Sequence, residues 1–119
     1  MPKSSWNSVK IKSPPRDELI AALRAWAAHL KQTHPTVQRV GLFGSYARSE
    51  HTPASDVDIL LVLSHALQPS PFQVPAEYYP PNIPVGCELQ AYGADQIARR
   101  QAENDPWIKH LLAEVIWLA

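Results

Sequence analysis

The continuous apolar run Ile59–Leu63 constrains the fold most, because it directly follows two aspartates, Asp56 and Asp58. Five consecutive Ile, Leu and Val residues predict a strand that is buried on both faces. Alternate residues of a strand share a face, so we expect both carboxylates to point the same way, with Cα atoms about 6.6–7 Å apart. Adjacent anions at the edge of a buried strand repel each other and are costly to desolvate without a cation. The pattern indicates either a cation-binding edge or a simple Asp-containing turn that starts the strand.

A second apolar segment, Val37–Phe43, runs directly into Gly44 and Ser45. Its apolar and β-branched residues predict another strand. Gly44 lets the backbone turn tightly and approach a ligand closely, and Ser45 is a good N-cap for a short helix over about Tyr46–Glu50. A helix N-terminus attracts phosphate through its unpaired N–H groups and its dipole. The order of strand, Gly-Ser turn, short helix and aspartate pair therefore favours a site for phosphate and metal over an isolated turn.

One known family has a similar arrangement. The polymerase-β-like nucleotidyltransferase superfamily has a signature that resembles residues 41–62, GLFGSYARSEHTPASDVDILLV. Its pattern of Gly-Ser, ten residues and Asp-x-Asp is matched here by Gly44, Ser45, Asp56 and Asp58. The short chain resembles in particular the minimal nucleotidyltransferases of bacteria and archaea. The resemblance implies an α+β nucleotidyltransferase fold, with a small mixed β-sheet packed against helices in a single domain.

The resemblance also implies a third carboxylate on a later strand, which serves as metal ligand and general base. Residues 84–92 (PVGCELQAY) are the only later stretch that reads as a strand, and Glu88 is its only acid. The family then implies that Asp56, Asp58 and Glu88 are both the catalytic residues and the ligands of Mg²⁺, with two ions expected. The family commonly has Asp where Glu88 stands. A solvated surface charge is the other interpretation of Glu88.

ATP is the implied substrate, attacked in line at its α-phosphorus by an acceptor hydroxyl while pyrophosphate leaves. Gly44 and Ser45 are expected to position the β- and γ-phosphates. Arg48, one turn further along, either approaches the triphosphate or is a solvated surface side chain. Ser49 stands where the family often has Gly.

The resemblance to minimal nucleotidyltransferases also suggests the acceptor and the partner. Many of these proteins are antitoxins that add AMP to a hydroxyl, typically of a tyrosine, on a HEPN-type ribonuclease toxin. We therefore expect a protein adenylyltransferase that forms a hetero-oligomer with such a toxin. The alternatives are a non-catalytic binding antitoxin and a nucleotidyltransferase that acts on a small hydroxylated molecule.

Length and composition are consistent with this expectation. The 119 residues, 45% of them hydrophobic, suit one domain over residues 14–119, preceded by a flexible arm over residues 1–13. The 11 basic and 11 acidic side chains balance, which argues against nucleic acid as the main partner. A lone cysteine, Cys87, excludes an internal disulfide and is interpreted as a small buried filler. The absence of a disulfide is typical of the reducing cytoplasm, where we expect this protein, and no apolar run approaches the roughly 18 residues of a membrane span.

Three further segments carry structural predictions. An apolar stripe predicts a helix over Arg16–Thr33, and Asp95 is expected to cap a helix that runs to about Glu103. A final helix is expected over about Trp107–Trp117, with surplus apolar residues that suit a protein interface. Residues 64–84 contain six prolines and cannot be helical throughout. Their aromatic residues either line a pocket or anchor the loop on the core, and we favour anchoring; they are Phe72, Tyr78 and Tyr79.

Overall fold

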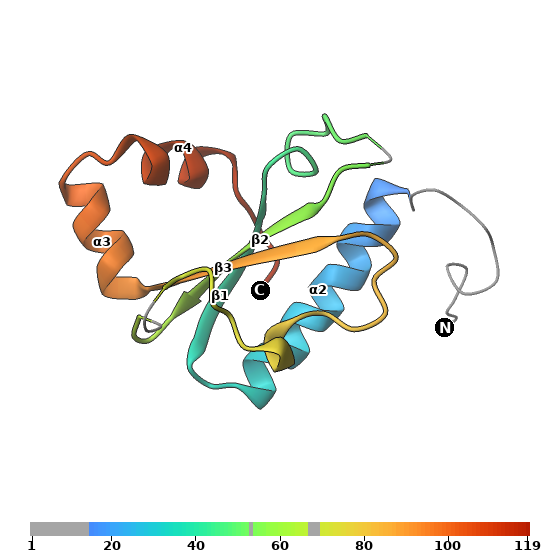
Figure 1. Ribbon diagram of the computed structural model, residues 1–119, viewed down its shortest axis with the longest axis horizontal. Coiled ribbons are helices and arrows are strands. Elements are labelled where there is room, and N and C mark those ends of the chain that lie inside the picture. Colours follow the sequence, from blue (N-terminus) through green and yellow to red (C-terminus); the bar gives the residue numbers. More distant parts are fainter. Residues whose placement is uncertain (1–14, 53, 67–69) are drawn as a thin grey trace.

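The computed structural model describes residues 15–52, 54–66 and 70–119. The predicted arm, residues 1–13, lies outside the described residues. The centre of the described chain is a four-stranded mixed sheet (Figure 1). Its strands are β1 (Val37–Phe43), β2 (Val57–Leu63), β3 (Cys87–Gly93) and β4 (Ile116–Trp117), in the spatial order β3–β2–β1–β4. Strand β1 is antiparallel to β2 and to β4, whereas β2 and β3 are parallel. The α+β class with a small mixed sheet is confirmed.

Helix α2 (Arg16–Thr33) covers one face of the sheet and has the predicted bounds (Figure 1). Its predicted stripe is buried, because positions three and four residues apart share one face of a helix. This stripe packs against the residues of β1 and β2 that point to the same side. The buried members of the stripe are Leu19, Leu23, Ala27 and Leu30.

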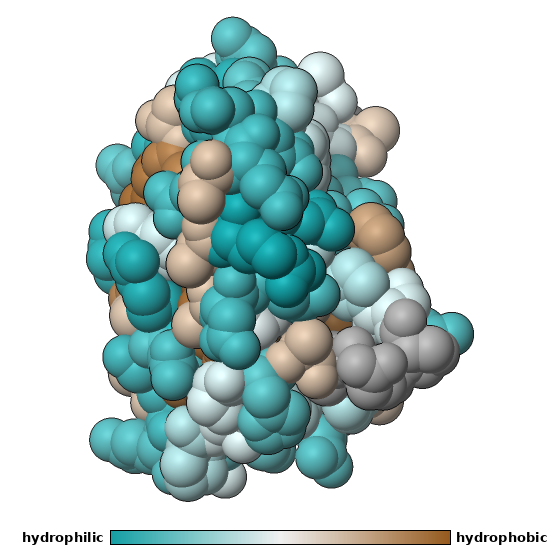
Figure 2. All heavy atoms as spheres, turned by 90° about the vertical axis from the view of Figure 1, so that its left-hand side faces the viewer, coloured by the Kyte–Doolittle hydropathy of each residue, from teal (hydrophilic) through white to brown (hydrophobic). Residues whose placement is uncertain are grey.

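Two shorter helices, α3 (Ala94–Ala102) and α4 (Pro106–Glu114), supply the apolar contacts of the other face. Leu60 and Val62 of β2 belong to this second cluster, whereas Ile59, Leu61 and Leu63 belong to the α2 side. The alternation follows from the two-residue period of a strand. The prediction that Ile59–Leu63 is a strand buried on both faces is therefore confirmed. Seen from the α3 side, the surface is mainly hydrophilic, with hydrophobic residues in small patches (Figure 2).

The C-terminal end differs from its prediction. Helix α4 ends at Glu114 instead of continuing to Trp117. Val115 is already extended, with φ −64° and ψ 140°, and Ile116 and Trp117 then pair with β1. β-Branched and aromatic residues favour strands, and β1 offers an edge that this segment covers. The apolar surplus expected of a longer helix is thus partly used in the sheet.

The cap of α3 also differs from its prediction. Asp95 lies inside the first turn of α3, and the N-cap is Gly93, whose N–H donates to Gln96 Oε1 at 2.9 Å. The predicted Asp95 cap was wrong. Helix α4 begins at Pro106, and Asp105 caps it by accepting a hydrogen bond from Trp107 N at 2.9 Å. Proline suits this first position because it lacks an N–H group.

In the described residues of the proline-rich segment, the backbone forms a short 3₁₀ helix, η1 (Ala76–Tyr78), and is otherwise irregular. Tyr78 and Tyr79 are partly buried against the α2-side core and so anchor the segment, and Tyr79 also lines a cavity between α2 and η1. Phe72 is 58% exposed and does not anchor it. Within the part of the chain that the structure describes, no helix has the length and apolar character needed to cross a membrane.

Candidate active site

The turn at residues 44–50, called the motif turn below, follows β1 directly. Gly44 has a φ of +81°, which a residue with a side chain rarely adopts. One α-helical bond forms, from Arg48 N to Gly44 O at 3.1 Å, and one bond of the 3₁₀ type, from Ser49 N to Tyr46 O at 3.3 Å, so the expected short helix is replaced by turns. The turn closes because Ser49 is left-handed, with a φ of +60°, and Glu50 N donates back to Ser45 O at 2.8 Å. Ser49 therefore occupies a conformation that suits the glycine common in the family.

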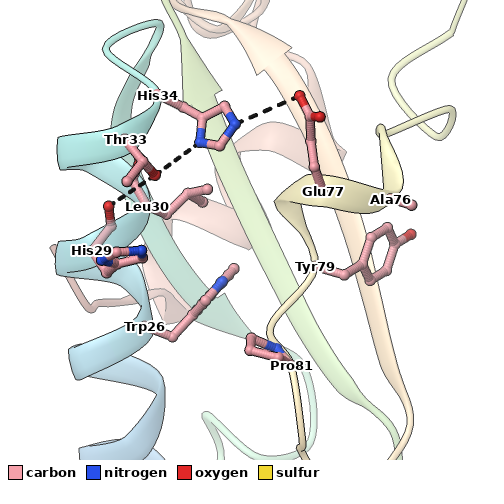
Figure 3. Close-up of a pocket in the computed structure, with 9 residues that line it drawn as sticks. All are labelled: Trp26, His29, Leu30, Thr33, His34, Ala76, Glu77, Tyr79 and Pro81. Carbon is pink, nitrogen blue, oxygen red and sulfur yellow. Dashed lines mark hydrogen bonds and ion pairs between the residues drawn. The ribbon is translucent and has the colours of Figure 1, made fainter.

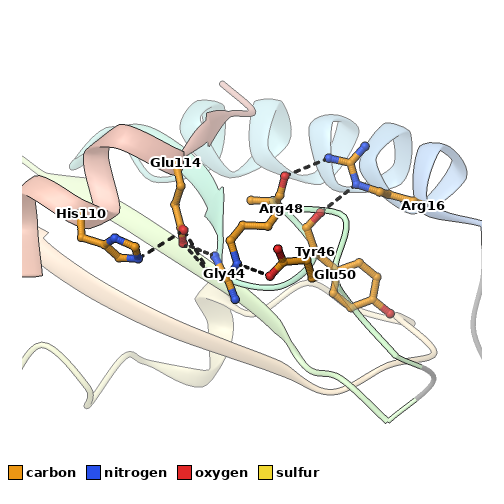
Figure 4. Close-up of polar contacts among 8 residues, drawn as sticks. Arg16, Gly44, Tyr46, Arg48, Glu50, His110 and Glu114 are labelled. Atoms are coloured by element: carbon orange, nitrogen blue, oxygen red, sulfur yellow. Dashed lines mark hydrogen bonds and ion pairs between the residues drawn. The ribbon is translucent and has the colours of Figure 1, made fainter.

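The start of α2 holds the motif turn in place (Figure 4). Arg16 donates from Nε to Tyr46 O at 2.8 Å and from Nη2 to Ala47 O at 3.2 Å. Tyr46 is fully buried, and its ring stacks on His51 with centroids 4.1 Å apart. No described residue accepts a hydrogen bond from the backbone N–H groups of Ser45, Tyr46 or Ala47. The turn thus presents three donors that suit an anion.

The three predicted carboxylates, Asp56, Asp58 and Glu88, lie at one end of the sheet, where the strands begin or end. This end of the sheet is called the carboxylate edge below. The carboxyl end of β1 and the amino ends of β2 and β3 lie together there, since Phe43 pairs with Asp58 and Asp58 pairs with Glu88. Asp56 immediately precedes β2, and its neighbour Val57 donates to Gly86 O at 2.8 Å. The backbone pairing therefore brings side chains from two strands beside the motif turn.

Two glycines make room for the aspartates. A Cβ atom at Gly44 would collide with Oδ2 of Asp58, and one at Gly86 would collide with Oδ1 of Asp56. Both carboxylates consequently pack directly against backbone. Gly44 joins the motif turn to the carboxylate edge, which is why the two halves of the sequence signature act as one structural unit.

The neighbouring carboxylates raise the proton affinity of Asp58. Burial, followed by the negative charges of Glu88 and Asp56, raises the pKa of Asp58 to about 6, while Arg48 opposes the rise. Asp56 and Glu88 are exposed, so a cation can approach from solvent. Carboxylate oxygens are the ligands that Mg²⁺ prefers, and a divalent ion would relieve this repulsion. The donor set fits such an ion, although over residues 15–52, 54–66 and 70–119 no three acidic, His or Cys side chains already form a metal-holding group.

Glu114, the last residue of α4, is a site residue that the sequence analysis missed. Its Oε2 accepts a hydrogen bond from Gly44 N at 2.7 Å, and its Oε1 lies 3.0 Å from Arg48 Nη1 (Figure 4). Burial opposes its ionisation, but the bonds from Gly44 and Arg48 outweigh that effect and lower the pKa of Glu114. The available signal was that Glu114 is the only acid in the α4 sequence, PWIKHLLAE.

Arg48 is neither free in solvent nor bound only to its own turn. It is 40% exposed, and it donates from Nε to Glu50 Oε1 at 2.9 Å in addition to its contact with Glu114.

Cys87 is a partly buried thiol whose pKa is raised to about 12 by burial and by the charges of Asp58 and Asp56. A thiol that stays protonated is a poor nucleophile, which supports its interpretation as a filler.

A cavity of about 430 Å³ lies elsewhere, between the C-terminal half of α2 and the η1 segment (Figure 3). Two of its lining residues, His34 and Glu77, form an ion pair, with His34 Nε2 3.5 Å from Glu77 Oε2. None of the predicted site residues lines this cavity. The motif turn instead contacts the N-terminal end of α2, so the carboxylate edge and the cavity are separate features. The cavity is lined by Trp26, His29, Leu30, Thr33, His34, Ala76, Glu77, Tyr79 and Pro81.

Comparisons with known proteins identify the family and the fold. The family model described as "Nucleotidyltransferase domain" matches residues 23–113, which is most of the chain. A solved structure, "Crystal structure of a putative nucleotidyltransferase from Sulfolobus solfataricus", is 18% identical, with a TM-score of 0.54 over 71% of this chain and 75% of that one. This likeness shows a shared fold. No curated protein sequence matches the chain. The family model covers more than half of the chain, so the chain belongs to the nucleotidyltransferase domain family.

Proposed function

We propose that this nucleotidyltransferase moves AMP from ATP to a hydroxyl of a partner protein and acts as an antitoxin. The resemblance to minimal nucleotidyltransferases favours a HEPN-type ribonuclease toxin as the partner and a tyrosine as the acceptor. The observation that carries the proposal is the pairing of Asp58 with Glu88 beside the motif turn. Carboxylates that attract a cation therefore lie beside backbone N–H groups that attract an anion.

Asp56, Asp58 and Glu88 would hold Mg²⁺, which supplies neutralisation of the triphosphate charge. The N–H groups of the motif turn would bind the phosphate oxygens, as unpaired backbone donors do. Glu88 is exposed at the start of β3, where a hydroxyl from outside the molecule can reach it. It would accept the hydroxyl proton as the oxygen bonds to the α-phosphorus. The bond to the bridging oxygen then breaks, and pyrophosphate leaves with the electron pair.

The charge around the site supports a protein acceptor over RNA. Near the motif turn, five carboxylates outnumber two guanidinium groups, those of Arg48 and Arg16. Such an excess of negative charge repels a phosphodiester backbone, which basic surfaces normally attract. The cavity described above lies apart from the carboxylate edge, so a small molecule bound in that cavity would not lie beside the carboxylates. The five acids are Glu50, Asp56, Asp58, Glu88 and Glu114.

The test is ATP-dependent labelling of a co-purified partner. Label on the α-phosphate of ATP should pass to the partner in the presence of Mg²⁺, whereas label on the γ-phosphate should not. The Asp56→Asn/Asp58→Asn double variant should lose at least ~10²-fold in rate, since it removes the charge that holds the metal. Undiminished labelling by that variant would overturn the proposal.

The double variant and the labelling assay together separate the alternatives. If it still neutralises the toxin fully in cells, the protein acts by docking and not by catalysis. If the label instead appears on a small hydroxylated molecule while the partner stays unlabelled, the acceptor class is wrong although nucleotidyl transfer stands.

A further inference from the structure

Glu114 connects the motif turn, whose free N–H groups the proposed function assigns to the triphosphate, to Arg48. It accepts the Gly44 N–H at 2.7 Å, and it lies 3.0 Å from Arg48 Nη1 through one oxygen and 3.3 Å through the other. Its side chain is only 13% exposed, against 40% for Arg48. Charge-assisted hydrogen bonds strengthen when they are shielded from water. The carboxylate therefore holds the backbone of the motif turn and the guanidinium at the same time.

The contacts of Arg48 leave part of its guanidinium available. Nε donates to Glu50 and Nη1 donates to Glu114, but no described residue accepts a hydrogen bond from Nη2. The guanidinium is close enough to Asp58 to favour the ionised carboxylate there. An arginine loses much rotamer freedom when it binds a ligand, and two carboxylate partners remove that freedom in advance. Arg48 is thus oriented beside the carboxylate edge before any ligand arrives.

Glu114 itself is fixed from both sides along the chain. Leu111, one turn earlier in α4, is buried, and the following residues Ile116 and Trp117 pair with Leu42 and Gly41 of β1. Those β1 residues lie two and three positions before Gly44. His110 adds a contact, with Nε2 3.5 Å from Glu114 Oε1 (Figure 4). The carboxylate therefore keeps a constant place relative to the end of β1.

We propose that Glu114 is a positioning residue that acts through Arg48, holding the guanidinium so that Nη2 binds the triphosphate. This inference rests on the proposed nucleotidyl transfer from ATP, but not on the identity of the acceptor. Glu114 touches no reacting atom. Glu114, which lies 66 residues from Arg48 in the sequence, would then determine the affinity of the signature residues for the nucleotide.

A mutant cycle tests this inference by direct binding. The four proteins are wild type, Glu114→Gln, Arg48→Ala and the double variant, and the probe is the Mg²⁺ complex of ATP with a methylene bridge between the α- and β-phosphorus. We expect Glu114→Gln to weaken binding by about 10-fold, the size of one charge-assisted hydrogen bond. In the Arg48→Ala background the same change should have no further effect. In transfer assays KM for ATP should rise by a similar factor, with a smaller change in kcat. Glu103→Gln, at the C-terminal end of α3, is the matched control and should bind as wild type does.

Each outcome decides the inference. An equal loss with and without Arg48 would show that Glu114 does not act through the guanidinium, and tighter binding by Glu114→Gln would show that it competes with phosphate; either result overturns the inference. If Glu114→Gln melts in the assay range, Glu114→Asp repeats the cycle, because it keeps the charge but withdraws the carboxylate by one methylene. Failure of the wild type to bind the probe would overturn both the proposed function and this inference. If the probe binds and the mutant cycle gives the expected result, but no partner protein is labelled, only the proposed acceptor is overturned.

Discussion

Asp58 carries the largest electrostatic strain among the signature residues. It is half-buried, faces Glu88 across the β2–β3 pair, and touches the backbone of Gly44. Its pKa of about 6 in the folded protein, against 3.8 for a free side chain, means that folding favours its protonated form. A site of this kind is stable without a cation at low pH and is destabilised by its own charge at neutral pH.

Replacing Asp58 by Asn should therefore stabilise the metal-free protein at pH 8 and leave its stability unchanged at pH 4. Between the unfolded and folded pKa values the folded state binds more protons, so the stability of the wild type falls as the pH rises from about 4 to 6. We expect the variant to gain about 1 kcal/mol at pH 8, less than the full shift implies because solvent screens a half-exposed group. Urea denaturation at the two pH values measures this. Equal stability of both proteins at pH 8 would contradict the electrostatic account.

Ser49 holds a strained backbone conformation, and relieving it should stabilise the protein. A left-handed φ of +60° is unfavourable for a residue with a Cβ atom by roughly 1–2 kcal/mol, and glycine avoids that penalty. Ser49→Gly should raise the free energy of unfolding by about 0.5–1 kcal/mol after the greater flexibility of unfolded glycine is counted. Thermal melting measures the gain. Ser49→Ala keeps the Cβ atom and serves as the control, so a gain for alanine as large as that for glycine would rule out this explanation.

At the scale of elements, the short strand β4 links the last helix to the sheet. Its two residues pair with β1 only a few positions before the motif turn. Trp117 packs over the backbone of Gly41, where an added Cβ atom would crowd its ring, and the Arg39 guanidinium lies 3.5 Å from the ring centroid. The strand thus holds the end of α4, and with it Glu114, against β1.

Trp117→Ala should cost about 2–3 kcal/mol of stability, because it removes a large partly buried side chain and a cation–π contact. The matched control is Trp107→Ala on α4, where the ring is 41% exposed and has an edge contact with Phe43. We expect the control to cost about half as much. Chemical denaturation of both variants measures the difference. A larger loss at Trp107 than at Trp117 would show that β4 contributes little.

At the scale of the whole molecule, the sequence pattern predicted those helices and strands whose burial depends mainly on their own residues. The apolar period of Arg16–Thr33 and the unbroken run Ile59–Leu63 led to the correct elements, since each buries its own residues whatever lies around it. The pairing of Asp58 with Glu88 followed from the family signature and not from periodicity. Glu114 and β4 could not be predicted this way. Their contacts join residues about 70 positions apart, and a stretch such as Val115–Trp117 suits a helix or a strand until a neighbouring edge decides.

The parallel pairing of β2 with β3 also has a consequence for the order of folding. Parallel neighbours cannot be joined by a tight turn, and here the connection is the proline-rich crossover of residues 64–86. Closing this long loop costs chain entropy before the β2–β3 contacts form and offset that cost. The antiparallel β1–β2 hairpin closes over a shorter span. Glu88 should consequently reach Asp58 late, so nucleotide chemistry belongs only to the fully assembled chain and not to a partly folded intermediate.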